Sequence, residues 1–122
     1  MTIAEVIAQV DELEPNQYSE EAKLRWLNEL DAQIYREVIE THDDPICESF
    51  EPYESTEQEL LVPFPWDGEL YRWSLITQIR LHNAESMRYN QAVTAFGAAY
   101  QSFADWYNRT HRPKAEGSRF LF

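Results

Sequence analysis

Apolar residues recur at the spacing of an α-helix near the beginning of the chain. Over residues 3–13 they line one side of a short helix. Thr2 and Glu5 have the spacing of a capping box, in which each side chain satisfies a free backbone amide of the first turn. Pro15 follows and cannot continue the helix. The pattern therefore predicts a short amphipathic helix with one buried face.

A longer helical pattern follows over residues 20–41. Ser19 precedes it as an N-cap, and the acidic residues of its first turn suit the positive end of the helix dipole. Leu27 and Ile34 lie two turns apart on the apolar side, so both are predicted core residues. Pro45 prevents any continuation.

Two further helices are predicted near residues 68–83 and 85–110. The first is apolar on two sides, which indicates a central position. In the second, large apolar residues are separated alternately by four and three residues, which gives a continuous seam facing the core. The residues predicted as core on these two helices are Trp73, Ile76, Phe96, Tyr100 and Phe103.

The connection over residues 43–67 contains four prolines and many acids, which favours extended chain. Short apolar runs in it leave room for a small β-hairpin around residues 54–56. The predicted fold is mainly α: a four-helix domain over residues 1–112, followed by a C-terminal interaction tail over 113–122. We expect the second and fourth helices to form the core pair, with the third between them.

Charge is unevenly distributed along the chain. Residues 1–59 hold 17 acids and 3 bases, a net charge of −14, whereas residues 60–108 have a net charge of −1 and residues 109–122 a net charge of +3. A protein that grips DNA or RNA needs a basic surface, so only the tail is suited to a polyanion. The acidic part is either a solvated face or a surface that repels nucleic acid.

Composition excludes several further classes of protein. A single cysteine, Cys47, allows no intramolecular disulfide and fits a reducing, intracellular environment. No apolar run reaches membrane-spanning length, so we expect a soluble protein that does not bind membranes.

No motif of catalysis or cofactor binding occurs. The chain has no nucleophile elbow, and none of His42, His82 and His111 completes a Glu-x-x-His metal motif. The few glycines exclude a phosphate-binding or dinucleotide-binding loop. The sequence therefore predicts neither an enzyme nor a metal or cofactor site.

Aromatic residues in places that a monomer can hardly bury are the remaining signal. They occur in the turn at residues 64–66 and in the last three residues of the sequence. The alternatives are that the tail folds back onto its own subunit or that turn and tail dock onto another chain. The predicted partner-binding residues are Phe64, Trp66, Arg119, Phe120, Leu121 and Phe122.

Several segments of the chain resemble small proteins encoded among the capsid genes of tailed phages and prophages of Gram-positive bacteria, the head–tail connector (adaptor, head-completion) proteins. These segments are Tyr18–Glu21, Arg25–Asp31, Ile34–His42, Glu59–Trp66, Arg88–Asn90 and Phe103–Lys114.

The resemblance implies a mainly α-helical virion protein, assembled in the bacterial host cytoplasm. It implies a ring of about a dozen sister subunits below the portal protein, followed by a tail-completion protein. DNA would pass through the ring only as cargo.

Two other functions are compatible with the residues. An acidic regulatory or DNA-mimicking protein would bind a basic host partner and would present its acids as a regular array. A helical enzyme that uses carboxylates would need several acids converging in a dry pocket, with raised pKa values.

Overall fold

The computed structural model describes residues 1–114. It consists of four α-helices, and the second of them continues into a π-helical turn. These elements are α1 (Ile3–Leu13), α2 (Glu20–Ile34), η1 (Tyr35–Ile39), α3 (Asp67–His82) and α4 (Ser86–Thr110). The predicted mainly α, four-helix fold is confirmed.

The helix starts form as the sequence predicts. At α1, the Glu5 amide donates to Thr2 Oγ1 at 3.2 Å, and the Thr2 amide donates to Glu5 Oε1 at 2.7 Å, which completes the capping box. At α2, the Ala22 amide donates to Ser19 Oγ at 3.1 Å. Each side chain satisfies a backbone group that the helix itself cannot pair.

The second predicted helix changes geometry at its end. Beyond Ile34 the backbone widens into η1, and the Glu40 amide donates to the Tyr35 carbonyl at 2.8 Å, five residues back. After this turn His42 is buried against Tyr107 of α4, with ring centroids 5.1 Å apart.

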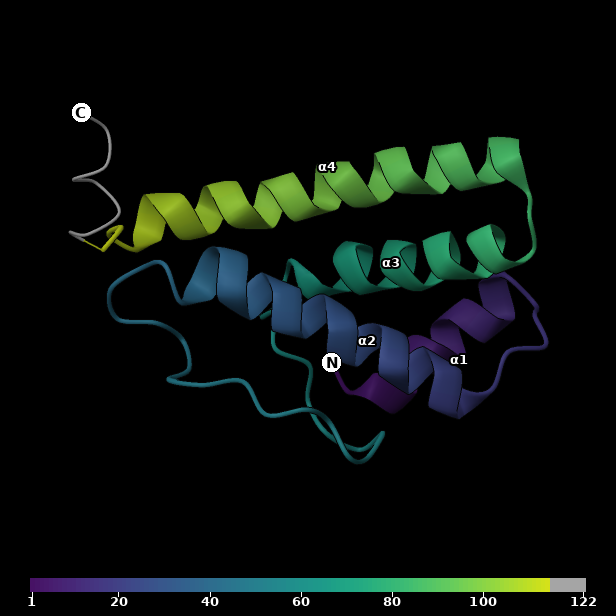
Figure 1. Cartoon of the computed structure of the whole chain (residues 1–122), viewed down its shortest axis with the longest axis horizontal. Helices are drawn as coiled ribbons and strands as arrows, with labels where there is room; N and C mark the ends of the chain where they lie inside the picture. Colours follow the sequence, from purple (N-terminus) through teal and green to yellow (C-terminus); the bar gives the residue numbers. More distant parts are fainter. Residues whose placement is uncertain (115–122) are drawn as a thin grey trace.

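The third helix is central, as predicted. α3 packs against α1, α2 and α4, and α4 lies beside nearly the whole length of α3 (Figure 1). The expected core pair was wrong, because the main partner of α4 is α3, whereas α2 approaches α4 only through η1. The short turn between α3 and α4 explains this, since it folds the two helices back on each other as antiparallel neighbours.

Four of the predicted core residues are buried, and three are not fully so. Leu27, Ile34 and Phe103 are completely buried and Ile76 nearly so. The other predicted core residues, Trp73, Phe96 and Tyr100, are only half-buried and pack at the border of the core.

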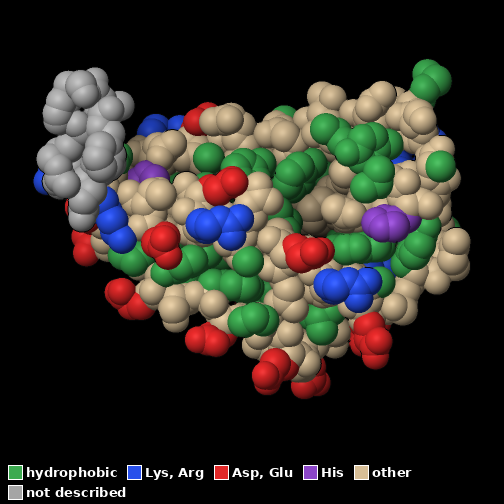
Figure 2. Space-filling model, in the orientation of Figure 1, with side chains coloured by type: hydrophobic (Ala, Val, Ile, Leu, Met, Phe, Trp, Pro, Cys, Tyr) green, Lys and Arg blue, Asp and Glu red, His purple; other side chains and the backbone are tan. Residues whose placement is uncertain are grey.

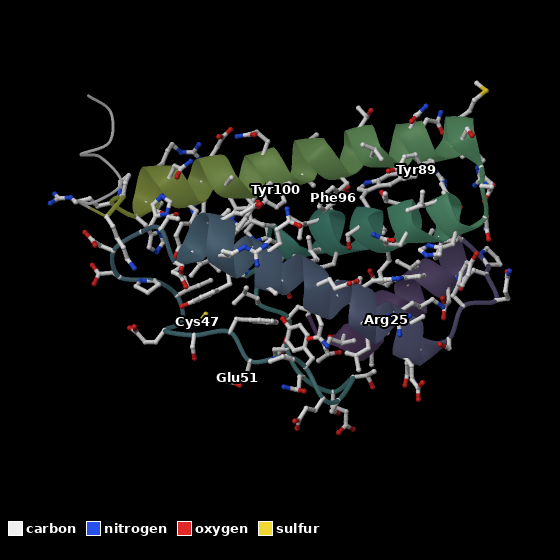
Figure 3. All side chains as sticks on the ribbon, viewed as in Figure 1. Arg25, Cys47, Glu51, Tyr89, Phe96 and Tyr100 are labelled. Atoms are coloured by element: carbon white, nitrogen blue, oxygen red, sulfur yellow. The ribbon has the colours of Figure 1, made fainter. Side chains whose placement is uncertain are left out.

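The border position of Phe96 follows from the length of α4. Figure 3 shows Tyr89, Phe96 and Tyr100 along the inner side of this helix. α4 has 25 residues against 16 in α3, and only its C-terminal half also meets η1 and the chain after it. In its N-terminal half, a hollow separates Phe96 from α2, so this ring is only half-buried.

The connection over residues 43–67 is extended, but the hairpin does not form; within residues 1–114 the structure has only isolated β-bridges. Instead, residues 58–60 of this connection pair with the N-terminus of the chain. Gln58 also closes a local turn, because its Oε1 accepts the Glu54 and Ser55 amides at 2.7 and 2.9 Å. The Ile3 amide donates to the Gln58 carbonyl at 3.1 Å, and the Leu60 amide to the Met1 carbonyl at 3.0 Å.

The chain that follows α4 lies beside the end of η1. The Asp43 amide donates to the Arg112 carbonyl at 2.7 Å, and the Lys114 amide donates to the Thr41 carbonyl at 3.0 Å. The predicted tail thus begins on the side of α4 that faces η1.

Candidate interaction surface

An apolar groove lies between α3 and α4, with a volume of about 490 Å³. One wall comes from α3 and the turn before it, and the other from α4. The lining residues are Pro65, Trp66, Glu69, Trp73, Ala95, Ala98, Ala99 and Ser102.

The groove exists because large and small residues face each other. Trp66 and Trp73 are seven residues apart, so their rings lie on the same side two turns from each other. The opposing residues of α4 are all small and also share one side, because they follow helical spacing: Ala95, Ala98, Ala99 and Ser102. Their short side chains do not fill the space beside the two tryptophans, so this stretch of α4 leaves a hollow.

Both tryptophans are fixed in place by their neighbours. Trp66 lies against Trp106 of α4, with ring centroids 5.6 Å apart, and its amide donates to the Pro63 carbonyl at 3.0 Å. The Trp73 indole donates to Glu69 Oε2 at 2.9 Å, while Arg72 pairs with the other oxygen of Glu69 at 2.5 Å. The walls of the groove are therefore preformed.

Phe64 adds an exposed aromatic ring next to the groove. It is 86% exposed, although it directly precedes two lining residues. Of the predicted partner-binding residues, Trp66 lines the groove, and Phe64 is exposed in the turn before it. The others, Arg119, Phe120, Leu121 and Phe122, lie outside the described residues.

Sequence reasoning missed most of this groove. Trp73 was expected in the core, whereas it forms a groove wall. Two features of the sequence indicate such a groove. Two tryptophans lie seven residues apart, and the next helix has small residues at helical spacing.

A separate polar centre is buried between α2, α3 and the 43–67 connection. Asp31 is completely buried. Its carboxylate accepts a hydrogen bond from Tyr53 Oη at 2.5 Å and from Tyr71 Oη at 2.7 Å. The same hydroxyls accept backbone amides: Tyr53 Oη from Leu61 at 2.9 Å and Tyr71 Oη from Val62 at 2.9 Å.

Burial controls the ionisation of this centre. Loss of solvation raises the pKa of Asp31 to about 6, against the opposing effect of the tyrosine hydrogen bonds. Burial, together with the charge of Asp31, raises the pKa of Tyr71 well above its ordinary value. Both carboxylate oxygens of Asp31 accept hydrogen bonds and are inaccessible to solvent, so no substrate can reach them. The centre instead holds the 43–67 connection against α2 and α3.

A second polar cluster joins the end of α1 to α3 and to the first turn of α4. Glu14 is almost buried and accepts Arg80 Nε at 2.8 Å and Arg88 Nη2 at 3.1 Å. Arg88 also pairs with Glu85 at 2.6 Å. These contacts neutralise Glu14 and orient the start of α4.

Other reactive or ligand-binding groups are sparse in the described part of the chain. Within residues 1–114, no three His, Cys, Asp or Glu side chains gather as a metal site requires. Burial raises the pKa of the Cys47 thiol, which makes it less reactive. Among the described helices, none has the length and apolar character needed to cross a bilayer.

Acidic side chains are scattered over the face shown in Figure 2, many of them along its lower rim. Arginine or lysine side chains lie between some of them on this face.

Comparison of the chain with known protein families, with curated proteins and with solved structures finds no match.

Proposed function

We propose that this protein is a structural, non-catalytic component of a tailed-phage virion, a head–tail connector that forms a ring below the portal protein. The observation that carries the proposal is the preformed apolar groove between α3 and α4 with the exposed Phe64 beside it. Exposed apolar surfaces of this kind mark sites of protein association.

The charge distribution agrees with a channel protein. The strongly acidic first half, with a net charge of −14 over residues 1–59, repels DNA at any surface that DNA passes. A channel through which DNA moves must bind DNA only weakly, because contacts between basic residues and phosphates would slow its passage.

The buried polar groups support a structural role over catalysis. A carboxylate with a raised pKa is a common mark of an active site, and Asp31 has one. Its oxygens are already occupied by Tyr53 and Tyr71, and no solvent reaches them. The carboxylate-enzyme alternative needs several acids that converge in one dry pocket, whereas the carboxylate of Asp31 is bound by two tyrosine hydroxyls.

Portal binding tests the proposal. The full chain is co-expressed with a portal protein from the same genome, and complexes are examined by size-exclusion light scattering and negative-stain microscopy. We expect a ring of this chain on the portal oligomer. Retention of the chain as a free monomer at high concentrations of both proteins would overturn the proposed function.

A matched pair of variants locates the contact. Phe64→Ser removes an aromatic ring that is 86% exposed, and Met87→Ser removes a side chain that is 84% exposed at the other end of the α3–α4 pair. Neither substitution disturbs the core. We expect Phe64→Ser to weaken portal capture or ring formation and Met87→Ser to leave both unchanged.

A further inference from the structure

The groove between α3 and α4 lacks a side chain to fill it within the described residues. Small residues of α4 form one wall, and Trp66 and Trp73 form the other. Water in such a groove contacts mainly apolar surface, so an apolar occupant gains free energy by displacing it. The volume, about 490 Å³, is in the range of a specific binding pocket.

We propose that the groove binds the segment Phe120–Phe122 of a second copy of this chain. This inference rests on the proposed function, since it names the contact between neighbouring subunits of the ring. The segment supplies three consecutive large apolar side chains, Phe120, Leu121 and Phe122.

Charge favours binding of this segment to any copy of the acidic domain. Residues 109–122 have a net charge of +3, whereas residues 1–59 and 60–108 have −14 and −1. Arg119 directly precedes the apolar segment, and Glu69 lies in the groove wall. Opposite charges therefore steer the tail toward the domain, and the apolar contact provides the specificity.

The position of the groove indicates a second copy as the source of the segment. Tyr100 Oη donates to Glu37 of η1 at 2.8 Å, so this side of α4 faces η1. Ala98 and Ser102 are each two residues from Tyr100, which places them on the opposite side of the helix, about 200° around its axis. The chain leaves α4 beside η1, where Lys114 pairs with Thr41.

The tail reaches its own groove only when it is fully extended. Passing half-way around α4 takes roughly 16–19 Å, and Ser102 lies about 12 Å back along the axis from Thr110. The two distances combine to a path of roughly 20–22 Å. Phe120 is six residues beyond Lys114 and covers roughly 20–22 Å only when every residue between them is fully extended. The groove of a neighbouring copy has no such limit, and a head-to-tail contact of this kind repeats around a ring.

The first test titrates the groove with the segment itself. The full chain carrying Phe120→Ser, Leu121→Ser and Phe122→Ser is labelled with ¹⁵N, and a peptide of residues 115–122 is added. We expect saturable shifts of the indole N–H signals of Trp66 and Trp73, whereas the signal of Trp26, which does not line the groove, stays in place. A peptide with the same three serines is the control.

Two substitutions on α4 provide a matched comparison. Ala98→Phe, added to the tail-substituted chain, fills the groove from an exposed position. Gln101→Phe adds the same ring at an exposed position outside the lining. We expect Ala98→Phe to weaken the peptide affinity by about tenfold or more, and Gln101→Phe to leave it nearly unchanged. Absence of shifts up to about 1 mM peptide, or equal shifts of all tryptophans, would overturn the proposal.

Dilution of the unaltered chain separates binding between copies from binding within one copy. We expect the Trp73 signal to move from the peptide-bound to the free position as the protein is diluted. A signal that stays at the bound position at every concentration would overturn the second copy as the source of the segment.

Portal capture distinguishes failure of this inference from failure of the proposed function. Normal ring assembly by the Ala98→Phe variant on the portal would reject the groove contact and leave the connector function standing. Binding of the peptide to a chain that captures no portal would reject the connector function and leave the contact between copies standing.

Discussion

Asp31 shows how one buried charge organises a small domain. Its carboxylate binds Tyr53 and Tyr71, and the two hydroxyls in turn bind the backbone of residues 61 and 62. The centre therefore joins two helices and the connection between them. Such a network specifies one position for an otherwise irregular segment, at the cost of removing a charge from water.

The raised pKa of Asp31 predicts an unusual dependence of stability on pH. The folded state binds this proton more tightly than the unfolded state, so the contribution of Asp31 is fully present below the unfolded pKa of 3.8 and is lost as pH rises through about 6. The change corresponds to about 3 kcal/mol. We expect the difference in unfolding free energy between Asp31→Asn and the parent to shift in favour of Asn by up to this amount between pH 4 and pH 7.5.

Urea denaturation at a series of pH values measures this difference. Asp43→Asn removes an exposed carboxylate and serves as the control. A constant difference between Asp31→Asn and the parent across the pH range would show that Asp31 is solvated or that its charge is compensated in the folded protein.

The importance of Asp31 was not apparent from the sequence. It lies between Leu27 and Ile34 in the apolar stripe of the second helix, and its neighbour Leu30 competes for the inward position. Its partners are 22 and 40 residues away. Only the folded connection brings the two tyrosine hydroxyls to it, so periodicity alone could not identify the centre.

At the scale of elements, α4 has two unlike halves. Near its C-terminus Phe103 and Tyr107 are completely buried, whereas Val93 is 39% exposed and Phe96 is half-buried. The seam has one sequence pattern throughout, but its surroundings change, because η1 and the chain after it cover only the C-terminal half.

The two halves predict different costs for the same substitution. Phe103→Ala leaves a cavity in the core and is expected to lower the unfolding free energy by about 3–5 kcal/mol. Phe96→Ala removes a ring that still contacts water and is expected to cost about 1–2 kcal/mol. Chemical denaturation of both variants checks the comparison. Equal losses would indicate that another surface covers Phe96.

Local signals predicted the elements better than their contacts. The caps at Thr2 and Ser19 and the stop before Pro15 depend on neighbours in sequence, so they could be identified directly. The widened turn at η1 and the pairing of residues 58–60 with the N-terminus depend on distant partners. The same is true of the groove, which needs the register of α3 against α4.

At the scale of the whole molecule, opposite charges are separated along the chain. The acids concentrate in residues 1–59, while Arg109, Arg112 and Lys114 are exposed near the end of the described chain. In a connector the basic residues serve a protein contact or a limited contact with DNA. In a DNA-mimicking protein the acidic surface itself is the binding site for a basic partner.

Salt dependence distinguishes these two functions. We expect no detectable binding of duplex DNA at about 150 mM salt, because few basic residues can reach phosphates while the −14 segment repels them. Fluorescence anisotropy with a labelled duplex measures this binding.

A DNA mimic would also fail to bind DNA, so the decisive measurement is which partner the full chain captures. An apolar portal contact at the exposed Phe64 predicts portal capture that changes little with moderate salt. Capture of a basic DNA-binding protein that falls steeply as salt rises would replace the connector with the DNA mimic.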